Sequence, residues 1–195
     1  TAVLTDRQNL LLQPGESRTV SFRYCMDSPA LWSPENPNLY TSTMQVLEGE
    51  EELDREETGF GIRTLSIDAA HGVRINGQTV KLRGACIHHD NGILGAATLP
   101  DAEERRIRQL KEAGFNAIRS SHHPAGRALL DACDRYGVLV MDELSDVWNV
   151  RKNPYDYALY FEQDWKPTIQ KMVAKDYNHP SVILYCVGNE ISEAG

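Results

Sequence analysis

The sequence predicts a β-sandwich segment over residues 1–67 and, from residue 68 onward, an α/β segment built around a parallel sheet. In the first segment, residues 18–24 and 39–49 alternate polar and apolar side chains, which is typical of strands with one solvated face. In the second, short apolar runs alternate with stretches of helical period, the order expected for parallel strands joined by helices. Two domains are therefore expected.

Turn signals separate the strands expected in the first half of the chain. Residues 13–17, QPGES, form a turn pattern, and residues 33–38, SPENPN, hold two prolines and two asparagines, which favour a loop. Further on, Asn76-Gly77 lies between two apolar alternations and predicts a hairpin. Trp32 is expected to pack inside the sandwich.

Three helices are expected in the second segment. The first would begin after Asp101, whose side chain would cap it together with Glu104 three residues on. The second is expected over residues 126–137. The third would begin near Asp164, so that Pro167 falls in its first turn, with Trp165 on its buried face.

Polar side chains follow each strand of the predicted parallel sheet. They are His88 and His89, residues 119–123, Asp142-Glu143 and Asn189-Glu190. A (β/α)8 barrel or an open α/β sheet gathers its chemistry at this carboxyl edge. Glu190 is therefore expected on a rigid strand end, with a pKa raised enough for it to act as a general acid. The plain alternative is an exposed loop acid.

The two histidine pairs have three interpretations. HHD at 88–90 and SHHP at 121–124 could bind a metal ion, hydrogen-bond a sugar or serve the fold. Adjacent residues of a strand point to opposite faces, so each pair offers one inward imidazole, which is poor spacing for a metal. Residues 141–149, MDELSDVWN, contain Asp146 and Trp148. These two either lie in a solvated loop or bind a sugar, the carboxylate accepting from its hydroxyls and the indole packing on its C–H face.

Composition narrows the class of protein. The 195 residues carry a net charge of −8, which disfavours nucleic acid and anionic membranes as partners. No apolar run is long enough to cross a membrane, and the first residues lack the pattern of a signal peptide. The four cysteines are widely spaced, which predicts buried free thiols in a reducing compartment and a cytoplasmic location.

Taken together, these motifs resemble glycoside hydrolase family 2, the family of β-galactosidases, β-glucuronidases and β-mannosidases. LWSPENPNLY is similar to its immunoglobulin-like domain just before the barrel. KLRGACIHHD, FNAIRSSHHP and CDRYGVLVMDE resemble its first three barrel strands. DYNHPSVILYCVGNE resembles the fourth. The resemblance implies an immunoglobulin-like β-sandwich segment followed by the first half of a (β/α)8 TIM barrel, strands 1–4.

The resemblance also implies roles for individual residues. Glu190 would be the general acid/base of a retaining exo-β-glycosidase, and Asn189 would contact the sugar 2-hydroxyl. Further substrate contacts are implied for five residues: His88, His122, Arg119, Asp146 and Trp148. SHHP and MDELSDVW are most similar to galactosidase-like members, so terminal β-galactosides are the expected substrates.

Two departures from the family pattern bear on cofactors and contacts. The Glu-x-His pair of magnesium-dependent members has no counterpart after the third strand, so no metal and no cofactor are expected. His123 stands where the family has a tyrosine.

The resemblance places the catalytic nucleophile on a seventh barrel strand, outside this chain. The sequence is therefore interpreted as a fragment that is inactive alone, whose partner is the C-terminal half of the barrel. Unpaired strands at the edges of the sheet can pair with another chain, so a homo-oligomer is a further expectation. Two rivals remain: a metal-dependent barrel hydrolase that uses the histidines, and a non-catalytic carbohydrate-binding module.

Overall fold

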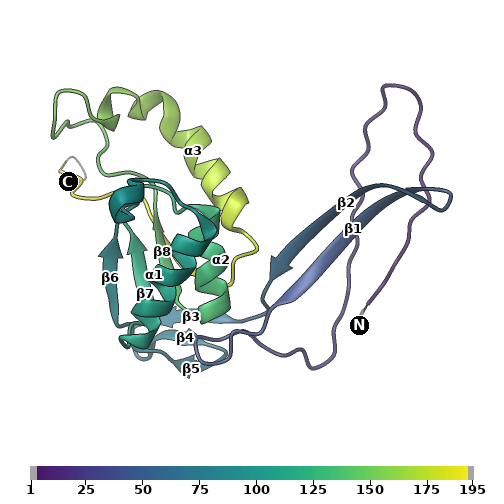
Figure 1. Ribbon diagram of the computed structural model, residues 1–195, viewed down its shortest axis with the longest axis horizontal. Helices are drawn as coiled ribbons and strands as arrows, with labels where there is room; N and C mark the ends of the chain where they lie inside the picture. Colours follow the sequence, from purple (N-terminus) through teal and green to yellow (C-terminus); the bar gives the residue numbers. More distant parts are fainter. Residues whose placement is uncertain (1–3, 193–195) are drawn as a thin grey trace.

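A computed structural model describes residues 4–192 (Figure 1). The ends of the two predicted domains, residues 1–3 and 193–195, lie outside the described residues. The antiparallel strands are β1 Tyr40–Glu48, β2 Glu51–Phe60, β3 Leu65–Asp68, β4 Gly72–Ile75 and β5 Gln78–Thr79. The parallel strands are β6 Gly84–Ile87, β7 Ala117–Ser120, β8 Leu139–Glu143 and β9 Val182–Cys186. The helices are α1 Pro100–Glu112, α2 Arg127–Tyr136 and α3 Phe161–Asp176, with short 3-10 turns at Gly92–Leu94 and Tyr157–Leu159.

The N-terminal part forms one two-stranded ribbon. β1 and β2 pair antiparallel and extend away from the α/β part (Figure 1). The strand predicted at residues 39–49 is confirmed, but the strand predicted at 18–24 is wrong, since those residues form no strand. An alternating pattern needs a hydrogen-bonded neighbour to become a strand, and in residues 4–39 only the bridge between Trp32 and Pro37 supplies such a pairing.

The predicted hairpin is confirmed. β4 and β5 are joined by Asn76 and Gly77, whose φ values of 51° and 79° are those of a tight turn between strands. The Asn76 amide also fixes two neighbouring segments. It accepts from the backbone N–H of Thr64 at 2.9 Å and donates to the carbonyl of Trp32 at 3.0 Å.

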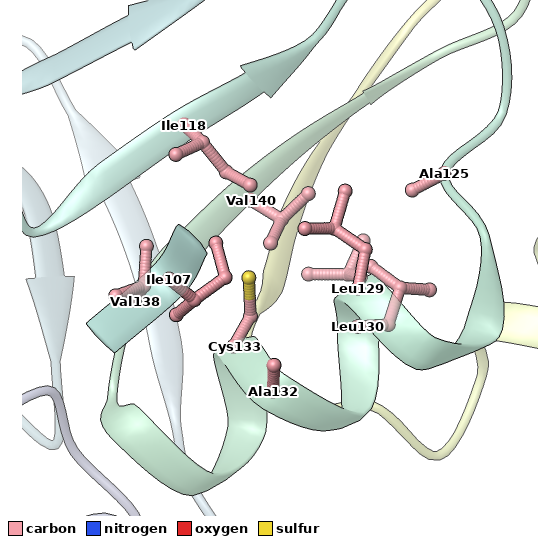
Figure 2. Close-up of a cluster of buried hydrophobic side chains, with 10 residues drawn as sticks. Ile107, Ile118, Ala125, Leu129, Leu130, Ala132, Cys133, Val138 and Val140 are labelled. Carbon is pink, nitrogen blue, oxygen red and sulfur yellow. The ribbon is translucent and has the colours of Figure 1, made fainter. Parts of the chain in front are cut away.

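The second segment is the predicted parallel α/β unit. Its sheet has the order β6-β7-β8-β9, all parallel, so the four carboxyl ends lie along one edge. α1 and α2 cover one face (Figure 1). Figure 2 shows the core between them, where Ile107 of α1 and Cys133 of α2 point toward Ile118 and Val140 of the sheet.

A second core seals the amino ends of the strands. Trp32 and Ile75 pack there against Ala117 and Leu139, the first residues of β7 and β8. The Trp32 Nε1 donates to the carbonyl of Asp134 at 2.9 Å. Trp32 therefore anchors the 32–38 loop to the parallel sheet, and the expectation of packing within a sandwich is wrong.

Two helix starts differ from the prediction. α1 begins at Pro100 with Leu99 as its N-cap and no side-chain cap, so Asp101 lies within the first turn instead of before it. Proline suits this position because the first N–H groups of a helix need no partner inside the helix. α3 begins at Phe161, and Pro167 lies in its interior. Trp165 is 42% exposed, so its assignment to the core is wrong.

The cysteine prediction is partly confirmed. All four thiols are free, but only Cys133 is buried, and Cys25 and Cys86 are exposed. Cys86 lies on β6, which has no neighbour on its outer side among the described residues. None of the described helices is both long and apolar enough to span a membrane.

Candidate active site

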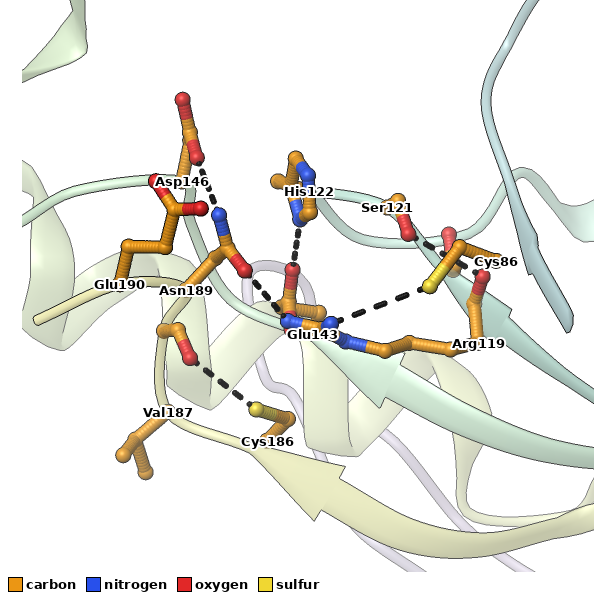
Figure 3. A network of polar contacts seen from close by, with 12 residues as sticks. Cys86, Arg119, Ser121, His122, Glu143, Asp146, Cys186, Val187, Asn189 and Glu190 are labelled. Carbon is orange, nitrogen blue, oxygen red and sulfur yellow. Dashed lines mark hydrogen bonds and ion pairs between the residues drawn. The ribbon is translucent and has the colours of Figure 1, made fainter. Parts of the chain in front are cut away.

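A buried carboxylate lies at the centre of the carboxyl edge of the sheet (Figure 3). Glu143, the last residue of β8, is fully buried. Its Oε2 accepts from the Nε of Arg119 at 2.7 Å, and its Oε1 lies 2.6 Å from the Nδ1 of His122. These two contacts link β8 to β7 and to the loop after it, and they fix the side chains of Arg119 and His122.

Arg119 extends the network to the segment after β9. Its second guanidinium nitrogen donates to the Oδ1 of Asn189 at 2.9 Å, and the Nδ2 of Asn189 donates to Asp146 at 2.8 Å. The backbone N–H of Asn189 donates to the carbonyl of Ser145 at 3.0 Å. The Asn189 amide is thus held in one orientation, with its oxygen toward Arg119.

Lys152 joins the acidic side chains of the site. Its Nζ lies 2.7 Å from Asp146 and 2.8 Å from the Oε2 of Glu190. The hydrogen bond and the charge of Lys152 lower the pKa of Glu190. Burial raises the pKa of Asp146, but hydrogen bonds from Lys152 and Asn189 outweigh it, and the net shift is downward.

Two expectations for Glu190 are corrected by this geometry. β9 ends at Cys186, so Glu190 lies in the following loop rather than on the strand, with φ of 47° and a side chain that is 72% exposed. Its pKa is lowered rather than raised, because the ammonium group of Lys152 favours the carboxylate and little burial opposes it.

The histidines meet in two ring pairs. His88 and His122 pack edge to face with centroids 5.3 Å apart, and His89 and His123 lie 4.4 Å apart. Burial, followed by the charge of neighbouring histidines, lowers the pKa of His89 and of His123. These two imidazoles are therefore neutral near pH 7, while His88 reaches the site through its contact with His122.

Possible metal ligands converge elsewhere in the described residues. Asp131, Asp134 and His179 place ligand atoms within 4.8 Å of one another. The carboxylate oxygens of Asp134 are already used: one lies 2.6 Å from the Nδ1 of His179, and the other accepts from the backbone N–H of Ser181. This arrangement fits a structural link between α2 and the start of β9, away from the predicted histidine pairs.

Trp148 supports the loop that carries Asn189. Its Nε1 donates to the carbonyl of Val187 at 2.9 Å, and its ring stacks on Phe161 with centroids 6.0 Å apart. A Cβ at Gly188 would lie 2.7 Å from the Cδ1 of Ile191 and 3.0 Å from this Nε1, so a larger residue there would displace one of these side chains. A sugar contact of Trp148 stays a prediction.

The comparisons with known proteins identify the family of this chain. The family described as "Glycosyl hydrolases family 2, TIM barrel domain" matches residues 69–195, and "Glycosyl hydrolases family 2" matches residues 2–63. The chain belongs to glycoside hydrolase family 2. The parallel sheet is thus part of a family 2 barrel domain, and the resemblance noted in the sequence is confirmed.

Family 2 relatives cover most of this chain. Beta-galactosidase BoGH2A of Bacteroides ovatus is 42% identical over 181 residues, which are 93% of this chain and 21% of that protein. A family 2 member from Bacteroides cellulosilyticus is 50% identical with a TM-score of 0.80 over 85% of this chain and 21% of its own. Beta-glucuronidase of Parabacteroides merdae is 29% identical with a TM-score of 0.73 over 85% and 20%. The chain spans about a fifth of the length of these relatives.

The structure brings together the predicted site residues Glu190, Asn189, Arg119, His122 and Asp146, with His88 at their edge. It adds Glu143 and Lys152, which the sequence did not assign to the site. Glu143 had a signal, since it ends an apolar strand in the same way as the other strand-end residues. No sequence pattern pointed to Lys152, because it lies in a long loop whose path the sequence does not determine.

Proposed function

We propose that this chain is part of a retaining exo-β-glycosidase that acts on carbohydrate substrates, with Glu190 as its general acid/base. The observation that carries the proposal is the continuous network from Glu143 through Arg119 and Asn189 to Asp146, Lys152 and Glu190 at the carboxyl edge of a family 2 barrel sheet. Such an edge is where barrel enzymes place their catalytic groups.

In this mechanism Glu190 protonates the glycosidic oxygen and then, as the carboxylate, activates water. The carboxylate form is the one that Lys152 stabilises, which suits the second step. The first step needs the protonated form, so substrate binding must weaken the contact between Lys152 and Glu190. Asn189 would bind the sugar 2-hydroxyl, and its fixed amide leaves little reorganisation for the transition state.

The nucleophile would come from another part of a longer protein. Retention needs a second carboxylate about 5–5.5 Å from the first. Glu143 is a poor candidate, since both of its oxygens are engaged by Arg119 and His122. Its role would be to orient the side chains of Arg119 and His122 toward the substrate. This chain by itself would then bind sugar weakly and turn over nothing.

The domain boundaries and the sugar are also proposals. Residues 1–67 would complete an immunoglobulin-like β-sandwich, and residues 68–195 would form the first four strands of the barrel. The relative from Bacteroides ovatus is named a beta-galactosidase, which favours β-galactosides over the glucuronides named for the Parabacteroides merdae enzyme. A panel of nitrophenyl β-glycosides would rank the sugars directly.

The test of the mechanism uses Glu190→Ala in the full-length protein. Nitrophenyl β-galactoside turnover is followed with and without azide, which can attack a glycosyl-enzyme once its general base is gone. A rate restored by azide, with β-galactosyl azide as product, is expected. Glu112→Ala on the exposed end of α1 is the control and should behave like the wild type.

Two outcomes would count against the proposal. If azide restores nothing and a chelator abolishes wild-type activity, a metal-dependent hydrolase replaces it. If the wild type hydrolyses no sugar of the panel but still binds one, a carbohydrate-binding module replaces it.

A further inference from the structure

A second pair of acidic side chains lies behind the site, between the sheet and α3. Asp142 of β8 is fully buried, and Asp176 in the last turn of α3 is 1% exposed. Successive residues of a strand point to opposite faces, so Asp142 turns toward the helix layer while Glu143 faces the site. The two carboxyl groups of Asp142 and Asp176 lie within hydrogen-bonding reach of each other.

The hydrogen bonds of these two groups leave one oxygen on each without a donor. The Oδ1 of Asp142 accepts from the backbone N–H of Ala125 at 2.7 Å and of Glu143 at 3.1 Å. The Oδ1 of Asp176 pairs with the ammonium group of Lys175. The Oδ2 of each is buried and receives no hydrogen bond from any donor among the described residues.

Two carboxylates cannot hydrogen-bond to each other unless a proton lies between them. Two buried negative charges in contact would also repel strongly in a medium of low dielectric constant. We infer that Asp142 and Asp176 share one proton, and that this protonated pair is a positioning device which holds the His122-bearing loop at the site.

The link to the site runs through Ala125. Residues 121–126 form the loop that carries His122, and Asp142 accepts the backbone N–H of Ala125 within it. Other contacts also hold the loop: the Ser121 N–H donates to the carbonyl of Ile87 at 2.8 Å, His122 lies 2.6 Å from Glu143, and the Gly126 N–H lies 3.3 Å from the Nε2 of His89. Of these contacts, the hydrogen bond to Asp142 is the one that connects the loop to the Asp142–Asp176 pair, and through it to α3.

The surrounding charges fit a pair with a single proton. From α3, Lys175 offsets the one negative charge that remains. From β9, burial, followed by the charges of Asp176 and Asp142, raises the pKa of Tyr185 to about 12, so Tyr185 stays neutral. From the loop, the backbone N–H of Ala125 faces the pair. Burial and the contact with Asp176 raise the pKa of Asp142 from 3.8 to about 7.

The sign of the pH effect follows from this raised pKa. Between about pH 4 and pH 7 the folded pair holds a proton that the unfolded chain releases, so the contribution of this pair to stability falls as the pH rises through this range. The unfolding equilibrium constant should change by up to about tenfold per pH unit within this range. Above pH 7 the pair loses its proton, the two charges repel, and the loop loosens.

The experiment compares Asp142→Asn, Asp176→Asn and the wild type of the full-length protein. Asparagine keeps an oxygen to accept hydrogen bonds and adds an N–H that replaces the shared proton at every pH. Thermal unfolding is measured from pH 4 to pH 8, and hydrogen exchange of residues 121–126 is followed by mass spectrometry at pH 6 and pH 8. Asp164→Asn, on the exposed side of the same helix, is the control.

Relative to both asparagine variants, the wild type should lose stability from pH 4 to pH 7, a comparison in which the carboxyl groups with lowered pKa values, such as those of Asp146 and Glu190, cancel. Loop protection in the wild type, corrected for intrinsic exchange, should drop severalfold at pH 8. The Asp164→Asn control should follow the wild type in both measurements, and the asparagine variants of the pair should keep their loop protection at pH 8. Equal pH slopes in the wild type and both asparagine variants would overturn the shared proton. If the asparagine variants differ from the wild type in pH slope but loop protection in the wild type is the same at pH 6 and pH 8, the positioning role would be overturned. Neither readout uses activity, so failure of the proposed glycosidase function would be seen separately.

Discussion

The ammonium group of Lys152 lies 2.8 Å from the carboxylate of Glu190 and 2.7 Å from that of Asp146. One lysine from the loop after β8 thus bridges two acids of the site that are 44 positions apart in the sequence. The contact lowers the pKa of Glu190, the residue proposed to transfer the proton.

Replacing Lys152 with methionine should raise the pKa of Glu190, because the cation that stabilises the carboxylate is lost. If Glu190 is the general acid, the alkaline limb of the kcat/KM profile should move to higher pH. The measurement is the pH dependence of nitrophenyl β-glycoside hydrolysis. Lys152→Arg keeps the charge and is the control; a limb that stays in place in Lys152→Met would show that the contact does not tune Glu190.

Replacing Arg119 with methionine should destabilise the fold. Glu143 would keep a buried carboxylate with only His122 beside it, and breaking a buried ion pair in this way costs about 3 kcal/mol or more. Urea denaturation measures the change. Arg55→Met is the control: Arg55 and its partner Glu57 are both exposed, so no measurable loss is expected. Equal stabilities of the two variants would contradict a structural role for the pair.

Truncating Trp32 to alanine should cost about 3–5 kcal/mol, since its ring is fully buried between the 32–38 loop and the amino ends of the strands. Trp165→Ala removes the same group from a site that is 42% exposed and should cost clearly less. Thermal and urea denaturation of both variants give the comparison. The reverse order would mean that the loop does not stabilise the barrel sheet.

Gly137 and Gly114 separate two effects of adding a Cβ. Both have positive φ, so alanine is strained by about 1–2 kcal/mol at either position. At Gly137 the new Cβ would also lie 2.3 Å from the carbonyl oxygen of Pro34, whereas at Gly114 nothing lies within 4 Å. Gly137→Ala should therefore be the less stable variant in denaturant titrations, and similar losses would show that the loop yields easily.

Much of the α/β part could be predicted from local pattern. Asn76-Gly77 specified its turn because both residues tolerate positive φ, and the apolar runs before residue 121 and before residue 144 became β7 and β8. The strand predicted at 18–24 failed because pairing requires a neighbour that the segment lacks in the described chain. The start of α3 was misplaced because Pro167 was expected in a first turn, whereas Phe161, which packs with Leu144 and Met172, begins the helix six residues earlier.

The sequence by itself determined that polar residues follow four parallel strands, and therefore that Arg119, His122 and Asn189 would share one edge of the sheet. The tertiary structure decided which of them touch. Glu143 meets Arg119 from 24 residues away, Asn189 meets it from 70, and Lys152 meets Glu190 across a loop. Such contacts depend on strand register, on the face to which each side chain points and on loop paths, and these are fixed only when the elements pack together.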